Sequence, residues 1–514
     1  MAVRAKLWAG LAAVPVVAMV FEVLRAPRPH FLDYWRILSY FMNDDGSIDP
    51  AGLFTLHNQH PIVTPGLLFW LDGLLTGGSN VAVGLVDVVL AAAAVLALRL
   101  MLPENGTKTA VLTVAFSFLL FSSGALEMFG MGMSGASWLL GFVPAVFAML
   151  CAHRGNTVAA LALGVLANLG HGTAFALWPA LALVAWLRGD AWWRVLAPLG
   201  TMVALVGGWL ALRSSPDVPG PGGAFGLDTV LAVIAGALSP LRAADGSPIA
   251  LAVGAAIMVV LVGFVVVALR EPRVPRPDAG WVGLGTHMLG AAAMIGFSRF
   301  DYGPTVGLTT RYATLSGLAT CAVLALVVLR KPTLSPVRVV VGASVVAAAT
   351  FAAGTLEAAT VRGQYPNQQL LAVAMRVGAD DVITTNRIDP ADVRLADRAG
   401  FYPFTDDFDL GCGVRLGQRL SRVGTAVGDV DTGPVQGDAE LRGWALVNGH
   451  RADCVFVVDG ADRVVGGGYT DVARPDVPDV ERTTEQRSGW AAVARPWVED
   501  GSVVVSSGGR FYRI

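Results

Sequence analysis

Apolar runs recur along the chain from its start to about residue 356, after which Asp, Arg, Gly and turn residues take over. Each run is close to the ~20 residues that a helix needs to cross a bilayer. The pattern predicts a body of about eleven membrane-spanning helices, residues 1–356, and a soluble tail, residues 357–514. The predicted spans are 7–24, 80–101, 109–123, 137–153, 156–170, 173–188, 194–212, 248–269, 281–297, 313–330 and 336–356.

The composition agrees with a polytopic membrane protein. Hydrophobic residues make up 54% of the chain and charged residues 15%, whereas soluble proteins are about 25% charged. The formal net charge of −2 gives no reason to expect a nucleic-acid partner, because basic patches drive that binding. The partner that the composition does predict is the lipid bilayer.

Basic residues in short loops predict the orientation, because such loops are cytoplasmic when rich in Lys and Arg. With these spans, the N-terminus is predicted to be cytoplasmic, and the first span is predicted to be a membrane anchor and not a cleaved signal. The loops 25–79, 124–136, 213–247 and 298–312 and the whole tail then lie outside. The apolar segment 62–77 is short and contains Pro65 and Asp72, so we interpret it as a helix in the outer leaflet. The cytoplasmic basic groups are Arg4/Lys6, Arg99/Lys108, His153/Arg154, Arg188/Arg194, Arg270/Arg273/Arg276 and Arg330/Lys331/Arg338.

Four cysteines divide between the two parts of the chain. Cys151 and Cys321 fall inside predicted spans, while Cys412 and Cys454 are the pair in the outside tail. An oxidising compartment and two thiols favour one disulfide between Cys412 and Cys454. Two unpaired buried thiols are the alternative.

The first outside loop is long and rich in Asp, His and aromatic residues. Its segment "DYWRILSYFM" has apolar residues at helical spacing, which places Asp33 at a helix N-terminus by the outer surface. Asp33 is either the cap of that helix or a catalytic carboxylate. Asp44, Asp45 and Asp49 are typical of turns, with a divalent metal or a second catalytic carboxylate as the alternative.

Further polar groups fall in the same set of outside loops. His57 and His60, three residues apart, are candidates for hydrogen bonding to a polar ligand or for binding a metal. Arg299 and Arg311 suit a phosphate, because the guanidinium fork matches phosphate oxygens; the alternative is that Arg299 pairs with Asp301 and Arg311 reaches lipid headgroups. The remaining candidates for binding a donor or substrate are Gln59, Glu127, His171 and Tyr312.

The membrane body resembles the GT-C superfamily of polyprenyl-phosphate-dependent glycosyltransferases. The likeness rests on an Asp just after the first span, an amphipathic helix, about eleven spans and a folded outside tail. Locally, "HNQHPIVTPGLL" is similar to an Asn-Glu-His-Arg motif of multi-span bacterial envelope proteins, with Gln59 and Pro61 replacing the Glu and the Arg. "SRFDYGPTVGLTTRY" is similar to their arginine-containing loop. The resemblance implies that Asp33 is the catalytic base and that Arg299 and Arg311 bind the donor phosphate.

Short β-branched segments in the tail, parted by Gly, Asp and Pro, predict an antiparallel β-sandwich at 436–514. It is similar to the jelly-roll, carbohydrate-binding-like modules of envelope glycosyltransferases, through "GWA", "RPDV" and "SGW". Trp444, Trp490 and Trp497 are either core residues or platforms for sugar rings. The segment 365–400 reads as helix, strand and helix, so we expect an α/β connector over 357–435.

These features together predict a glycosyltransferase of the bacterial plasma membrane. It would move a hexosyl or pentosyl group from a polyprenyl-phosphate donor to a glycan or lipid acceptor on the outer face. No phosphate loop, dinucleotide motif or strong metal spacing is present in the sequence, so no cofactor is expected. The alternatives are a transporter or flippase of lipid-linked sugars and a non-catalytic glycan-binding membrane protein.

Overall fold

The computed structural model describes residues 2–58, 60–104, 106–212, 226–243, 246–274, 276–432, 440–481, 483–495 and 501–514. Its contacts divide the chain into two compact units. The second unit combines the predicted tail with parts of the long first loop. The first unit comprises Met1–Ala26, Pro50–Leu68 and Asn80–Arg362, and the second comprises Pro27–Asp49, Phe69–Ser79 and Gly363–Ile514.

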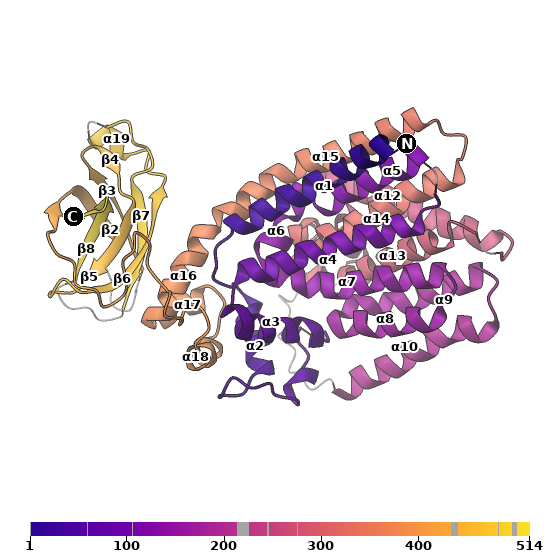
Figure 1. The fold of residues 1–514 in the computed structure, drawn as a ribbon, viewed down its shortest axis with the longest axis horizontal. Helices are drawn as coiled ribbons and strands as arrows, with labels where there is room; N and C mark the ends of the chain where they lie inside the picture. The colour runs from indigo at the N-terminus through magenta and orange to yellow at the C-terminus, as the bar shows by residue number, and fades with distance from the viewer. Residues whose placement is uncertain are drawn as a thin grey trace. The chain divides into compact units, whose positions relative to one another are not determined.

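The first unit is a bundle of helices in which α7 packs against α4 and α8, and α13 packs against α11 and α14 (Figure 1). Short 3₁₀ turns join several of them. The helices are α1 (Ala2–Arg25), α4 (Asn80–Met101), α5 (Gly106–Leu120), α6 (Leu126–Gly130), α7 (Gly132–His153), α8 (Thr157–Gly170), α9 (Leu177–Leu187), α10 (Trp192–Leu212), α11 (Leu227–Leu238), α12 (Pro248–Arg270), α13 (Ala279–Arg299), α14 (Ala313–Arg330) and α15 (Pro336–Gly363). The 3₁₀ turns are η1 (Gly52–Phe54), η2 (Ser123–Ala125), η3 (Gly172–Ala176), η4 (Phe300–Tyr302), η5 (Val306–Leu308) and η6 (Thr310–Tyr312).

Within the described residues, seven helices are long and apolar enough to cross a membrane, or eight if the pair α5 and η2–α6, bent by 45°, is one span. This number is compatible with a multi-pass membrane protein. Each of the eleven predicted spans does coincide with a helix, but α8 and α9 have only 14 and 11 residues, short of the ~20 that a full crossing needs. His287 and several glycines lower the mean hydropathy of α13. The predicted count of about eleven therefore exceeds what helix length and hydropathy support.

The loops at one end of the bundle are those predicted to be cytoplasmic. Lys108 donates a hydrogen bond to the Pro332 carbonyl at 2.8 Å. Arg330 lies 2.9 Å from Glu271 and 2.7 Å from Asp278, so the loop after α12 meets the end of α14. These contacts place the predicted cytoplasmic loops together, as the alternation of spans requires.

A tight helix crossing organises the opposite end. The Asn80 side chain accepts a hydrogen bond from the Gly132 backbone at 2.7 Å and donates one to the Gly130 carbonyl at 2.9 Å. A Cβ on Gly135 would lie 1.9 Å from the Met128 carbonyl oxygen, so only glycine allows this approach. α4 thereby fixes the break between α6 and α7.

In the second unit, a helix from the long loop packs against one from the segment after α15, and another helix of that segment packs against a β-sheet. The segment 365–400 contains three helices, and the strand predicted between the outer two is a helix in the structure. Asp380 and Asp381 occupy its first turn, where the helix dipole favours acidic residues. The helices are α2 (Asp33–Phe41), α16 (Tyr365–Val377), α17 (Asp380–Thr385), α18 (Pro390–Ala399) and α19 (Val477–Val480); α3 (Val63–Thr76) runs from the first unit into the second.

The strands of the tail form one hydrogen-bonded sheet, in the order β1-β9-β8-β5-β6-β7-β3-β2, with β4 paired to β3. Only Ala426 separates β1 from β2, although these strands stand at opposite ends of that order. The sheet must therefore curl until its two edges meet. The strands are β1 (Gly424–Thr425), β2 (Val427–Thr432), β3 (Glu440–Val447), β4 (His450–Arg451), β5 (Cys454–Val458), β6 (Val464–Val472), β7 (Gly489–Ala494), β8 (Ser502–Ser507) and β9 (Arg510–Arg513).

The predicted strands of the sandwich are present, but the predicted antiparallel pattern has one exception, because β1 and β9 are parallel. Trp490 is 1% exposed and belongs to the core of the sheet. Trp444 is partly buried, and Trp497 lies outside the described residues. The predicted disulfide between Cys412 and Cys454 is confirmed.

Candidate functional site

The end of the first unit opposite the paired loops that were predicted to be cytoplasmic carries a group of ionisable and aromatic side chains from five separate segments. We call it the polar cluster. Contacts between its members or with shared neighbours bring together most of the residues that the sequence predicted for donor binding. The polar cluster consists of His60, Glu127, His171, Arg299, Arg311 and Tyr312.

A two-residue turn presents His60. The His57 N–H donates to the His60 carbonyl at 3.0 Å, and the His60 N–H donates to the His57 carbonyl at 2.8 Å. Asn58 adopts a left-handed conformation with φ of 48°, which Asn tolerates better than most residues. The two histidines are therefore paired across a turn and not along a helix face. Gln59, the remaining predicted binding residue, lies outside the described residues.

Aromatic contacts hold the rings of the polar cluster in place. The ring centroids of His60 and His171 are 4.8 Å apart, and those of Trp138 and His171 are 4.1 Å apart. Trp138 also meets Tyr312 edge-on at 5.3 Å. A Cβ on Gly172 would lie 2.4 Å from His60 Nδ1. The His60 turn consequently requires glycine at the start of η3.

Both histidines are neutral at neutral pH. Burial is the main cause that lowers the pKa of His60 to about 4, with smaller contributions in the same direction from the neighbouring Arg299 and His57. Burial also lowers the pKa of His171, with His60 and Arg299 acting in the same direction. The Thr173 N–H donates to His171 Nδ1 at 3.1 Å, so the proton of the neutral ring is on Nε2. Because the rings of His60 and His171 carry no charge, they can donate or accept hydrogen bonds with a ligand and would not repel a cation.

The two arginines of the polar cluster have few carboxylate partners. Arg311 Nε lies 3.9 Å from Glu127 Oε1, and its side chain is 51% exposed. The predicted alternative of an Arg299–Asp301 pair is not formed; Arg299 instead lies over the Tyr302 ring, with its Cζ 5.5 Å from the centroid. Among the described residues Arg299 has no carboxylate within salt-bridge distance. Glu127 accepts a hydrogen bond from Thr310. The polar cluster contains two guanidinium groups and one carboxylate, so its ionised groups carry an excess of positive charge.

Arg242 is a positioning residue that the sequence did not indicate as functional. Its side chain is 1% exposed and donates to the carbonyls of Gly307 at 3.2 Å and Thr309 at 3.1 Å. It also donates to Ser239 at the end of α11. It thus ties the loop that precedes Arg311 to α11. The available signal was a single Arg directly after an apolar stretch.

Asp33 belongs to the second unit and occupies the first position of α2. The N-cap position is taken by Leu32, so Asp33 lies one residue inside the helix, in the first turn, where the helix dipole favours a carboxylate. Asp33 is exposed and lines a cavity of about 430 Å³ together with Arg36, Arg387 and Asp392. Leu32 and Arg387, which also line it, have φ of 50° and 60°. Strained backbone of this kind clusters at functional sites.

The interpretation of Asp45 as a turn residue is confirmed. Its carboxylate accepts hydrogen bonds from the Ser47 backbone at 3.0 Å and from the Ser47 hydroxyl at 2.6 Å. Asp44 lies 2.5 Å from Arg398. Within the part of the chain that the structure describes, no group of three His, Cys, Asp or Glu side chains is placed to hold a metal ion.

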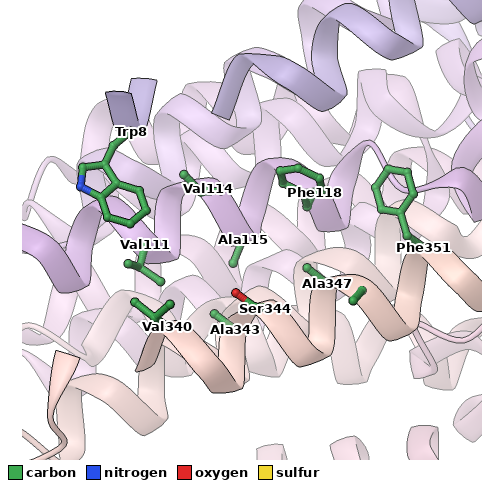
Figure 2. A pocket seen from close by; sticks show the side chains of 11 residues that line it. Trp8, Val111, Val114, Ala115, Phe118, Val340, Ala343, Ser344, Ala347 and Phe351 are labelled. Atoms are coloured by element: carbon green, nitrogen blue, oxygen red, sulfur yellow. The ribbon is translucent and has the colours of Figure 1, made fainter. Parts of the chain in front are cut away.

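An apolar cavity of about 260 Å³ opens between α1, α5 and α15 (Figure 2). Trp8 lines one end of it and Phe351 the other, with the Phe118 ring 5.6 Å from that of Phe351. The Phe351 carbonyl accepts a hydrogen bond from Ser123, in the turn that precedes Glu127. Phe351, at one end of the cavity, is therefore tied to the segment that leads into Glu127 of the polar cluster.

No match to this chain is found among protein-family models, curated proteins or solved structures.

Proposed function

We propose that this chain is a GT-C-type membrane glycosyltransferase that transfers a sugar from a polyprenyl-phosphate donor to an envelope glycan or lipid on the outer face. The observation that carries the proposal is the excess of positive charge in the polar cluster. Arg299 has no carboxylate partner among the described residues, and Arg311 has a distant one. A lipid phosphate supplies the missing negative charge in the bidentate geometry that guanidinium groups favour.

The apolar cavity supports a donor with a long hydrocarbon chain. Its walls are aliphatic and aromatic side chains, with Ser344 as a hydroxyl among them. Part of an isoprenoid chain lies there while the phosphate meets Arg299 and Arg311. The neutral rings of His60 and His171 hydrogen-bond the sugar or phosphate oxygens.

In the proposed reaction Asp33 takes the proton of the acceptor hydroxyl. The acceptor oxygen then forms a bond to the anomeric carbon, and the bond from that carbon to the phosphate oxygen breaks. Polyprenyl phosphate leaves with the electron pair, and the arginines stabilise its charge. Different residues thus stabilise the leaving phosphate and remove the proton, so mutations can separate these two contributions to the reaction.

Donor binding tests this assignment. Arg299→Ala and Arg311→Ala should each weaken the binding of a polyprenyl-phosphate sugar to the purified chain in nanodiscs by about tenfold or more, since hydrogen bonds between charged groups contribute ~1.5–3 kcal/mol. Arg338→Ala, an exposed arginine after the start of α15, is the matched control. Unchanged binding in both cluster variants would contradict the proposal.

Two buried groups favour transport of a lipid-linked sugar as a second candidate. Asp87 in α4 is 0% exposed and His287 in α13 is 1% exposed. The Asp87 carboxylate meets the backbone of Ala136 and the His287 ring meets the backbone of Ala176, and neither has a side-chain hydrogen-bond partner among the described residues. Ionisable groups inside spans are candidates for transport. The test uses liposomes that contain the Asp87→Asn variant. If the variant no longer moves a lipid-linked sugar across the membrane but still transfers sugar, transport is the favoured function.

A further inference from the structure

A polar cavity of about 680 Å³ lies in the second unit, between the helices α16–α18 and the sheet. Contacts of α16 with β6 and β7, and a 3.1 Å hydrogen bond from the Tyr469 hydroxyl to Asn367, join these two parts. The cavity is distinct from the one beside Asp33. Its charged lining consists of Arg376, Arg394, Arg495, Asp380 and Asp397.

The three arginines of this cavity lack the carboxylate partners that seven other arginines of the unit have. Within the described residues, none of them makes an ion pair, although two aspartates line the same cavity. Arg376 instead lies beside two aromatic rings, 5.9 Å from the centroid of Phe404 and 6.0 Å from that of Phe408. Arginines of the same unit that do pair with carboxylates are Arg28, Arg398, Arg442, Arg451, Arg474, Arg487 and Arg513.

The side chains around this cavity offer three kinds of contact to a ligand. The guanidinium groups offer paired donors, which match a carboxylate. Asp380 and Asp397 offer acceptors, which match hydroxyl groups but repel a bare anion. Phe404 and Leu416 offer apolar surface, on which the C–H face of a sugar ring can lie. A ligand with one carboxylate and several hydroxyls on a ring satisfies all three.

We propose that this cavity binds an acidic saccharide that carries a carboxylate group. The carboxylate meets Arg394 and Arg495, the ring hydroxyls meet Asp380 and Asp397, and the ring lies toward Phe404. The proposal does not rest on sugar transfer, because it concerns an equilibrium at residues that the transfer chemistry does not use. A chain inactive as a transferase would still bind the saccharide.

Calorimetry on the full chain in nanodiscs tests this site with three probes: a uronic-acid trisaccharide, a neutral trisaccharide and inorganic phosphate. We expect the acidic saccharide to bind, and the neutral one to bind at least tenfold more weakly. Arg394→Gln should weaken the binding of the acidic saccharide by about tenfold or more. If Arg394→Gln fails to fold, Arg495→Gln takes its place and should weaken this binding by the same factor. Arg510→Gln, an exposed arginine in β9, is the matched control and should bind as the wild type does.

Asp397→Asn separates a saccharide site from a general anion site. This substitution replaces one carboxylate oxygen, a charged acceptor, by an NH2 donor and removes a negative charge. It should therefore weaken the hydrogen bonds to the saccharide hydroxyls and strengthen the binding of phosphate. Equal binding of acidic and neutral probes, or phosphate binding as tight as the saccharide, would overturn the proposal. An Arg394→Gln variant with the melting temperature and the saccharide affinity of the wild type would also overturn it.

Discussion

Gly172→Ala tests the packing that positions His60. The added Cβ would lie 2.4 Å from His60 Nδ1 and 3.3 Å from two further ring atoms, whereas ordinary carbon contacts begin near 3.5 Å. The ring must therefore move by about 1 Å. It has little room, because the His171 ring packs against it at a tilt and is itself held by Trp138 and Thr173. Overpacking of this kind costs ~1–3 kcal/mol.

The assay is thermal unfolding of the purified chain in detergent, followed by tryptophan fluorescence. Gly207→Ala in α10 is the matched control, because its Cβ would meet nothing within 4 Å; it should be neutral or stabilising by up to ~1 kcal/mol. We expect Gly172→Ala to melt at a lower temperature and to weaken donor binding. His60→Ala should remove most of that loss in the double variant, since the two changes share one contact. If Gly172→Ala had the same melting temperature as the Gly207→Ala control, the proposed packing would be refuted.

Three further predictions concern the fold and its pH dependence. Cys412→Ser should lower the free energy of unfolding of the second unit by ~4 kcal/mol in the chain-entropy model, because the disulfide closes a loop of 42 residues; Cys321→Ser is the control, and an unchanged melt would contradict it. The pKa of His60 is about 4 in the folded chain, against an ordinary value of 6.5. Between these two values the unfolded chain binds one more proton than the folded chain, so the free energy of unfolding should fall as the pH decreases from 6.5 to about 4. A His60→Asn variant whose melting temperature shows the same pH dependence would count against this. Arg242→Gln should weaken donor binding and lower the melting temperature, because it leaves the carbonyls of Gly307 and Thr309 without their donor; normal binding would remove its positioning role.

Local patterns were sufficient to predict most helices and most strands, although α11 was not expected inside the predicted loop 213–247. The length of the apolar runs indicated the helices that coincide with predicted spans. Short β-branched segments parted by Gly, Asp and Pro indicated β3, β5, β6, β7 and β8. The pairing of Cys412 with Cys454 followed from counting thiols in one compartment. The "DDVITT" segment was misassigned because its β-branched residues suggested a strand, while Asp380 and Asp381 at the helix N-terminus favoured α17.

Contacts between distant segments could not be predicted in the same way. The curl of the sheet depends on β1 pairing with β9, almost ninety residues away in the sequence. The role of Arg242 depends on carbonyls more than sixty residues away. The two-residue turn at His57 was missed because its left-handed residue is Asn58, with no glycine to mark it. Sequence indicated most members of the polar cluster but not the geometry that joins them.

Sugar transfer by an Asp33→Asn variant tests the central proposal most directly. Wild-type chain and variant would be given a polyprenyl-phosphate sugar and envelope acceptors, with turnover and donor binding measured separately. Asp45→Asn is the control, because that carboxylate serves the Ser47 turn. A lost general base should reduce turnover by ~10²–10⁴ while donor binding stays near wild type. Wild-type turnover in Asp33→Asn, or no transfer by the wild-type chain to any acceptor, would contradict the assignment.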